Sequence, residues 1–178
     1  MAPQARPRQA SPLDRRIRRQ ALMIKQLIAT IITIFIISLP LTASAQDDVS
    51  AHGFPIATIQ IQTDYGDTLS LNVEVARTSR DRAKGLMHRE TLGDIDGMLF
   101  IWQNAALRQF WMKNTPLSLD ILFFDEDGTL VHIEEAQTPF SESLIHSLLP
   151  AQYVLELPAG DSARRNIALG DRLSKLPK

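Results

Sequence analysis

The chain of 178 residues contains no cysteine. This absence excludes disulfides, a lipid-modified N-terminal cysteine, thiol catalysis and thiolate metal sites together. A domain without disulfides depends on its hydrophobic core for stability, so the core-forming segments are the first features to locate in the sequence.

Positive charge is scarce beyond residue 45, where 12 Lys/Arg stand against 19 Asp/Glu, a net charge of −7. The first 45 residues hold seven Lys/Arg and one acidic residue, so the whole-chain net charge of −1 conceals an acidic domain. An acidic domain repels a phosphate backbone on average, and we therefore do not expect nucleic acid as a partner.

Several catalytic signatures are also missing. The sequence has no nucleophile elbow centred on serine, no His/Glu spacing of the zinc type and no glycine loop of the phosphate-cradling type. The acidic run Asp125-Glu126-Asp127-Gly128 lacks the ligand series of a calcium loop and is typical of a hairpin turn. We expect no metal and no cofactor, and the sequence leaves open whether the protein is an enzyme.

Methionine and histidine raise the question of a soft metal such as Cu(I). The residues concerned are Met87, Met98 and Met112 with His88, His132 and His146. No Met and His stand at a tight ligand spacing, so we favour core filling by flexible side chains beside aromatic rings.

The N-terminal region has the pattern of a signal peptide. Basic residues precede an apolar run over 27–41, which is shorter than the ~20 residues of a membrane-spanning helix. Ala43-Ser44-Ala45 matches a signal-peptidase site, so we predict cleavage before Gln46, with Met23 as an alternative start. We expect a periplasmic or secreted protein that meets the membrane only through an uncleaved signal segment.

Without the first 45 residues, the 178-residue chain has 133 residues, enough for one domain, which we expect to be a monomer. Residues 46–56 indicate a flexible leader and residues 57–176 a single β-rich domain. Apolar and polar residues alternate from Ile59 to Val75 around a Gly66 turn, which predicts a hairpin. The remaining pattern predicts these elements: a helix over 79–87, strands over 98–102 and 108–112 separated by a turn at 103–107, a hairpin of 119–124 and 129–136, an irregular flap over 138–149, a strand over 153–157, a helix from Asp161 to near Gly170, and an edge strand at 171–173.

These elements predict an α+β fold that is mostly antiparallel β, a compact twisted sheet or partly closed barrel with two short helices. Five ordered blocks then resemble the domain-of-unknown-function family 192 over roughly residues 56–175. The blocks are Gly85-Leu86-Met87-His88-Arg89, Gly97-Met98-Leu99-Phe100, Phe110-Trp111-Met112-Lys113-Asn114-Thr115, Leu119-Asp120-Ile121, and Val154-Leu155-Glu156-Leu157 with Gly160. The resemblance implies a compact, mostly β domain with no established activity. The chain departs from the family pattern at Ser118, where the family usually has proline.

The segment from Phe110 to Thr115 is the strongest candidate for a site. A buried strand rarely holds adjacent Lys113 and Asn114, so the pair indicates either the rim of a pocket or a turn in which Asn114 caps the chain before Pro116. Phe110 and Trp111 face opposite sides of a strand, which predicts one core residue and one residue that covers a surface or pocket.

Charged residues near apolar segments allow several roles. Arg89 could bind an anion or favour the C-terminus of a helix. Asp120 and Glu156 lie within apolar strands, where carboxylates most often form structural ion pairs, and we expect Asp120 to pair with Lys113 and Glu156 with Arg89.

We therefore interpret the sequence as a binding domain for a small polar or carbohydrate-like ligand. The expected ligand-binding residues are Arg89, Trp111, Lys113, Asn114 and Asp120. One alternative is an envelope hydrolase that uses Asp120 and Glu156. Another is a protein-partner interaction module that uses an exposed strand edge.

Overall fold

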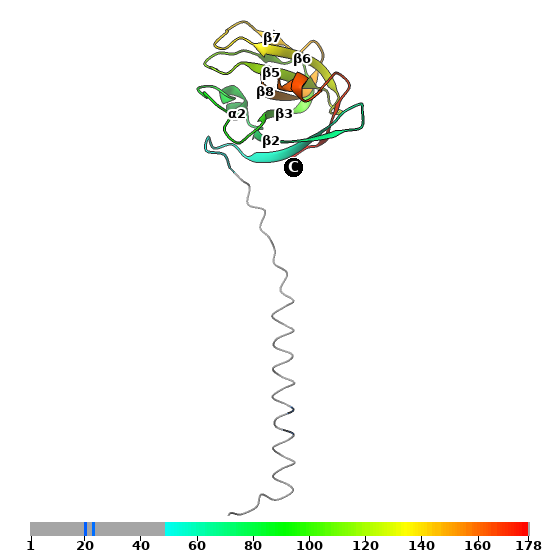
Figure 1. The fold of residues 1–178 in the computed structure, drawn as a ribbon. Helices are drawn as coiled ribbons and strands as arrows, with labels where there is room; N and C mark the ends of the chain where they lie inside the picture. Colours follow the sequence, from blue (N-terminus) through cyan, green and yellow to red (C-terminus); the bar gives the residue numbers. More distant parts are fainter. Residues whose placement is uncertain (1–19, 21–22, 24–48, 178) are drawn as a thin grey trace, which may run out of the picture. The chain divides into compact units, whose positions relative to one another are not determined.

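The computed structural model describes Gln20, Met23 and residues 49–177 (Figure 1). The predicted signal peptide, its cleavage site and residues 46–48 of the predicted leader lie outside this range, apart from Gln20 and Met23. Within the described residues, none of the helices combines the length and the apolar character needed to cross a membrane.

One mixed sheet of seven strands forms the fold, in the order β6-β5-β8-β3-β2-β1-β9. Figure 1 shows β2, β3, β8 and β5 side by side across the domain. The pairs are antiparallel except for β2 and β3, which are parallel. The strands are β1 (Ile56–Gln62), β2 (Thr68–Ala76), β3 (Gly97–Ala106), β5 (Leu119–Phe124), β6 (Leu130–Gln137), β8 (Ala151–Pro158) and β9 (Arg172–Lys175). The α+β prediction of a mostly antiparallel twisted sheet is confirmed.

The two edge strands of this sheet meet at one end. Thr129 and Arg172 form an isolated antiparallel bridge, and the Leu130 amide donates to the Asp171 carbonyl oxygen at 2.7 Å. The contact involves the start of β6 and the start of β9 and does not extend along the strands. The sheet is therefore strongly curled but not closed into a barrel.

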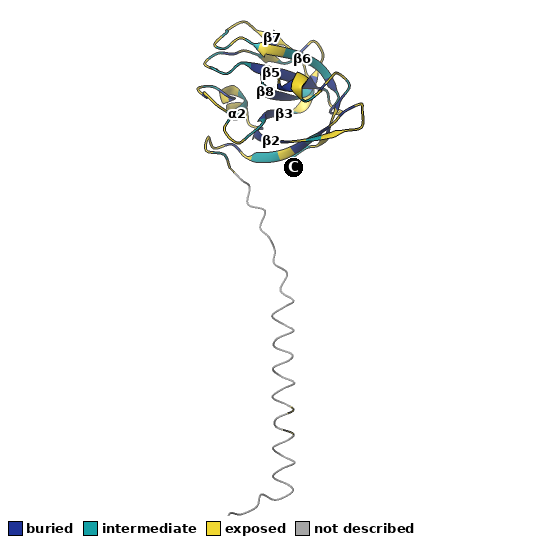
Figure 2. Cartoon of the chain, viewed as in Figure 1, coloured by how far each residue is buried: buried dark blue, intermediate teal, exposed yellow. Residues whose placement is uncertain are grey.

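The sheet has an apolar core on each face, which explains the composition of β5. Leu119, Ile121 and Phe123 of β5 pack into one core, and Leu122 and Phe124 pack into the other. Every residue of β5 is buried, as the dark blue strand in Figure 2 shows. Strands buried on both faces lose the apolar and polar alternation that β1 and β2 keep.

Both helices are shorter than predicted. The α2 helix (Ser79–Lys84) begins at Thr78, whose side chain accepts a hydrogen bond from the Asp81 amide, and ends where Gly85 adopts a φ of 46°. The α3 helix (Asp161–Arg164) ends before Asn166, whose φ of 54° turns the chain so that Ile167 enters the core.

Two predicted elements around the site differ from the structure. The turn expected at 103–107 is wrong, because β3 continues to Ala106. The strand expected at 108–112 is reduced to β4 (Gln109–Phe110), which pairs with β7 (Ile145–His146). Part of the predicted irregular flap over 138–149 is thus a strand that holds β4 in place.

The predicted flexible leader is also corrected where the structure describes it. Phe54 is buried in the same core as Leu86 and Phe100. The Val75 amide donates to the Pro55 carbonyl oxygen at 2.8 Å, so the chain joins the sheet before residue 57. An aromatic side chain buried before the first strand stabilises the domain through apolar contacts.

Candidate functional site

Four aromatic side chains line one pocket, which we call the aromatic pocket. Its volume is about 330 Å³, and its aromatic residues are Phe100 and Trp102 of β3, Phe110 of β4 and Trp111. The opposite wall is formed by α2 and the residues that follow it, and the rest of the lining is Ser79, Arg82, Ala83, Lys84, Gly85, Leu86, Met87, Gln109, Thr115 and Glu156. This pocket lies at the segment that the sequence singled out.

Phe110 and Trp111 both line the aromatic pocket, and only Phe110 lies in a strand, so they do not occupy opposite faces of one strand as expected. They differ instead in burial. The Phe110 ring makes edge contacts with Phe100 and Phe123, with ring centroids 5.3 and 5.9 Å apart. Trp111 remains 44% exposed. Phe110 therefore belongs to the core side of the pocket, and Trp111 forms its solvent-exposed wall.

Among the described residues that line the aromatic pocket, Glu156 is the only one with a carboxyl group. It lies on β8 between Met98 of β3 and Ile121 of β5, on the face that holds the core around Phe100. Glu156 is buried, and its side chain makes no hydrogen bond to any residue between 49 and 177. Burial raises the pKa of Glu156 to about 8, although the charge of Arg89 acts in the opposite direction. At neutral pH the group is thus mainly a carboxylic acid, which can both donate and accept a hydrogen bond.

Arg89 does not line the aromatic pocket and is paired with a different carboxylate. Its Nη2 atom is 2.5 Å from Glu74 Oε2, and its guanidinium lies 5.3 Å from the centre of the Phe54 ring. Glu74, Met98 and Glu156 occupy neighbouring positions across β2, β3 and β8. Arg89 therefore influences Glu156 through its charge, while its direct ion pair is with Glu74 rather than with Glu156 as the sequence predicted.

Asp120 lies on the other face of the sheet. It stands opposite Leu157, whereas its neighbour Ile121 stands opposite Glu156. Asp120 accepts hydrogen bonds from the Ser162 hydroxyl at 2.6 Å and from the amides of Gly160, Ser162 and Ala136. The predicted pairing of Asp120 with Lys113 is wrong, because these contacts anchor α3 and the end of β6 instead.

This placement also separates the two carboxyl groups of the hydrolase alternative. Cross-strand partners in a sheet share a face, so Asp120 and Glu156 point to opposite faces. They cannot act on one glycosidic bond, which requires two carboxyl groups on either side of the bond.

Lys113 and Asn114 lie beside Trp111 and do not line the aromatic pocket. Lys113 Nζ is 5.1 Å from the centre of a Trp111 ring and 3.5 Å from Glu142 Oε1. Asn114 has a φ of 55°, and its carbonyl oxygen accepts from the His88 amide at 2.7 Å. Asn114 thus forms the turn that the sequence offered as one alternative, and Lys113 covers the outer side of the Trp111 wall.

The methionines and histidines are dispersed. Met98 and Met112 are buried in the core around Phe100, and His132 stacks on Phe123 with its ring 2.9 Å from Glu134. Among the residues that the structure describes, no three His, Cys, Asp or Glu side chains form a group that could hold a metal ion. The buried methionines act as core packing.

The sequence interpretation did not include Trp102, Phe100 or Arg82 in the site. It ended the strand at Trp102, although Met98, Phe100 and Trp102 alternate as residues on one strand face do. A strand continued through residue 106 would have placed Phe100 and Trp102 together. Arg82 comes near them only through the packing of α2, for which the sequence has no signal.

The architecture defines an open, curled sheet with one aromatic pocket at the end of α2. The chain belongs to the family DUF192, described as an uncharacterized ACR, whose model matches residues 60–175. Recognition of this family from the five sequence blocks is confirmed.

Two solved structures are similar over nearly their whole length. A protein from Sinorhizobium meliloti 1021, whose description proposes a transcription regulator, is 40% identical, with 71% of this chain and 96% of that chain covered and a TM-score of 0.66. A protein of unknown function from Novosphingobium aromaticivorans DSM 12444 is 34% identical, with 74% and 94% covered and a TM-score of 0.68. The search of curated proteins returned no match.

Proposed function

We propose that this protein is an exported, periplasmic or secreted, domain that binds a small neutral polar ligand of the sugar type in the aromatic pocket. The observation that carries the proposal is Glu156, a buried carboxyl group that faces the pocket without a hydrogen-bond partner among the described residues. Buried polar groups are nearly always hydrogen-bonded, so a ligand group is a reasonable partner for it.

The chemistry of the lining supports a hydroxylated ligand. Aromatic faces such as that of Trp111 pack on the C–H surfaces of a sugar ring, and a neutral carboxylic acid can donate to one ligand oxygen and accept from a hydroxyl. Thr115 and Gln109 offer further polar groups at the same lining. The volume of about 330 Å³ lies at the lower end of the range for ligand pockets, which favours a ligand of one or two rings.

Hydrolysis and DNA binding receive less support. Glu156 is the only carboxylate among the residues that line the aromatic pocket, so a second catalytic carboxyl group is not at hand. The description of the Sinorhizobium meliloti relative does not lead us to propose DNA binding here, because residues 46–178 have a net charge of −7.

Tryptophan fluorescence tests the proposal directly. The chain has two tryptophans, Trp102 and Trp111, and both line the aromatic pocket. Titration with a panel of monosaccharides and disaccharides should change the emission of the wild type for at least one sugar. Trp111→Ala should weaken the binding of that sugar about tenfold or more, since stacking on an aromatic face contributes on the order of 1–3 kcal/mol.

The matched control is Tyr65→Ala, which removes an aromatic side chain that is 87% exposed in the turn between β1 and β2. Tyr65→Ala should leave the affinity unchanged. The proposal fails if no sugar in the panel binds the wild type more tightly than it binds Trp111→Ala.

The protonation of Glu156 gives a second readout. If the acid form donates to the ligand, affinity should fall as the pH rises through about 8, the pKa of Glu156 in the folded protein. Glu156→Gln keeps a donor and an acceptor at the same place, so its affinity should not change over this range. An identical pH profile for the wild type and Glu156→Gln would remove Glu156 from the binding site.

A further inference from the structure

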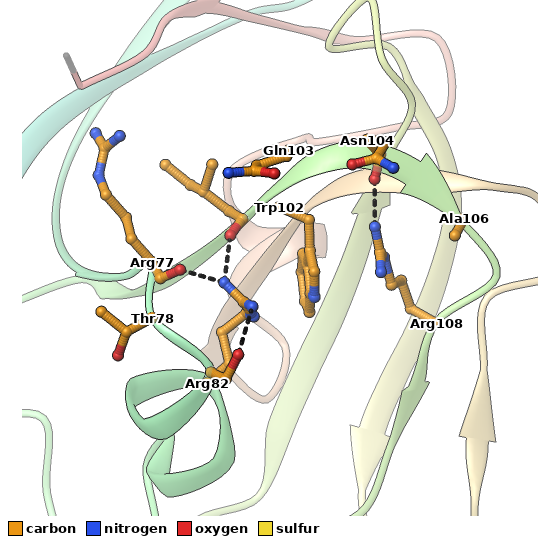
Figure 3. A pocket seen from close by; sticks show the side chains of 10 residues that line it. Arg77, Thr78, Arg82, Trp102, Gln103, Asn104, Ala106 and Arg108 are labelled. Carbon is orange, nitrogen blue, oxygen red and sulfur yellow. Dashed lines mark hydrogen bonds between the residues drawn. The ribbon is translucent and has the colours of Figure 1, made fainter.

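A second hollow, which shares Trp102 with the aromatic pocket, lies between α2 and the end of β3 (Figure 3). We call it the arginine hollow. Its volume is about 720 Å³, and its lining residues are Arg77, Thr78, Ser79, Arg82, Ile101, Trp102, Gln103, Asn104, Ala106 and Arg108. None of these ten residues is acidic, although the domain as a whole has an excess of acidic residues.

The positive charges of Arg82 and Arg108 are not neutralised by the chain. Neither guanidinium forms an ion pair with a carboxylate in the part of the chain that the structure describes. Their acceptors are uncharged oxygens. Arg82 Nη1 donates to the carbonyl oxygens of Ile101, at 2.9 Å, and of Arg77, and Arg82 Nη2 donates to the Ser79 hydroxyl at 3.4 Å. Arg108 Nε donates to the Ala151 carbonyl oxygen at 2.9 Å, and Arg108 Nη2 donates to that of Asn104. Carbonyl oxygens hold the side chains in place but leave their charge uncompensated.

Trp102 fixes the two cations relative to each other. The Arg108 and Arg82 guanidinium carbons lie 4.3 and 5.0 Å from the centre of a Trp102 ring, and Figure 3 shows the indole between the two groups. Burial and the nearby charge of Arg82 both lower the pKa of Arg108. The fold therefore holds two like charges close together, and a bound anion would relieve their repulsion.

Both guanidinium groups retain unused donors. Arg108 Nη1 and Arg82 Nε have no hydrogen-bond acceptor among residues 49–177, and the exposed side-chain amides of Gln103 and Asn104 lie at the same lining. Guanidinium N–H groups are well suited to carboxylate and phosphate oxygens. Because the indole separates the two guanidinium groups, a ligand that engages both needs charged groups at two places.

We propose that the arginine hollow binds a small ligand with two anionic groups, of the dicarboxylate or diphosphate type. The site is distinct from the aromatic pocket, because Arg108 lines only the arginine hollow of these two, although Arg82 and Trp102 form a wall of both. The proposal does not depend on sugar binding.

The test uses succinate and pyrophosphate as probes, with acetate and inorganic phosphate as the counterparts that have one anionic group. Isothermal titration at constant ionic strength should show that one of the two probes binds at least about tenfold more tightly than its counterpart, since each charge-assisted hydrogen bond contributes on this scale. The probe that binds identifies the carboxylate or the phosphate class. In Trp111→Phe, where Trp102 is the remaining tryptophan, the same probe should change the emission.

Two variants locate the site. Arg108→Gln should weaken binding of the probe about tenfold or more. Arg172→Gln removes an equal charge from an exposed position of β9 and should change the affinity little. Asn104→Asp places a negative charge in the hollow at an exposed position, so it should abolish binding without disturbing the core even if Arg108→Gln folds poorly.

Three outcomes would overturn the proposal. The first is that neither probe binds the wild type more tightly than its counterpart with one anionic group. The second is that Arg172→Gln weakens binding as much as Arg108→Gln, which would indicate a general charge effect. The third is that Asn104→Asp binds as tightly as the wild type.

Discussion

Arg89 and Glu74 approach to 2.5 Å (Nη2 to Oε2) while their side chains are only 3% and 1% exposed. Neither of these two atoms makes a hydrogen bond with suitable angles, so the contact depends on the attraction of the charges. Both residues line a hollow that also includes His88 and Glu90.

Removing one member of this pair should destabilise the fold strongly. Arg89→Met leaves Glu74 buried and unpaired, which typically costs ~3–5 kcal/mol. Urea unfolding of Arg89→Met should therefore show a much lower midpoint than the wild type. The double variant Glu74→Leu/Arg89→Met should recover most of the loss, and equal midpoints for the single and double variants would contradict this account.

The stability of the wild type should fall as the pH rises from about 4.5 to about 8, in part because of Glu156. The pKa of this carboxyl group is about 8 in the folded protein against an ordinary value of 4.5, so unfolding releases a proton within that window. The unfolding free energy falls by up to ~1.4 kcal/mol per pH unit when unfolding releases one proton. Glu156→Gln cannot lose this proton. The unfolding free energy of the wild type minus that of Glu156→Gln, measured in urea, should therefore become more negative as the pH rises. A difference that does not change with pH would refute the raised pKa of Glu156.

Asp120→Asn should destabilise the protein by at least ~2 kcal/mol, because an amide cannot accept all four hydrogen bonds that the carboxylate accepts. Burial by itself would raise the pKa of Asp120, but the bonds from Ser162, Ala136 and Gly160 outweigh burial and lower it. A lowered pKa stabilises the fold above the ordinary value of 3.8, and this stabilisation is lost as the pH falls through the folded pKa. The stability gap between wild type and variant should thus narrow below pH 3.8, and a gap that widens would contradict the proposed hydrogen bonds.

Gly97→Ala should be among the most damaging small substitutions in the chain. A Cβ atom at Gly97 would lie 2.1 Å from the Glu156 carbonyl oxygen and 2.9 Å from Leu157 Cδ2, so β3 and β8 would have to separate. We expect a loss at or above the upper end of ~1–3 kcal/mol in thermal or urea unfolding. Gly93→Ala is the control: its φ is +64° but no atom lies within 4 Å of the added Cβ, so ~1–2 kcal/mol of backbone strain is expected.

Phe110→Ala should cost more stability than Trp111→Ala, although tryptophan is the larger residue. Phe110 contacts Phe100, Trp102 and Phe123, and its removal should cost about 3 kcal/mol. Trp111 is 44% exposed, so its removal should shift the urea midpoint less. A larger shift for Trp111→Ala would show that its ring contributes to the core.

Local sequence patterns were sufficient wherever a segment has one buried face. Alternation from Ile59 to Val75 predicted the hairpin of β1 and β2, and the helix expected from residue 79 begins there as α2. Ser118 shows the limit of such patterns. It stands just before β5, where the family usually has proline, and its hydroxyl donates to the carbonyl oxygen of Gln137 in β6 at 2.9 Å. A local pattern does not predict this contact with a distant part of the chain. Helix lengths were overestimated because Gly85 and Asn166 adopt positive φ values that depend on the packing of the residues after them.

The candidate site could be predicted only in part. The sequence singled out Trp111, which does line the aromatic pocket. Lys113 and Asn114 lie beside Trp111 but do not line the pocket, and Asp120 lies on the face of the sheet opposite to Glu156. The strand register decides which face a carboxylate occupies, and a shift of one residue reverses that face. No local pattern sets the register of β5 against β8.

The sequence by itself determined the family, the predominance of β structure and the acidic balance of the domain, because these follow from composition and from contacts between near neighbours in the chain. Tertiary structure decided that Glu156 meets four aromatic rings in one pocket and that Arg82 and Arg108 meet across Trp102. The physical reason is that pKa shifts and uncompensated charge arise from burial and from neighbours distant in sequence, which exist only once the sheet has curled and α2 has packed against it.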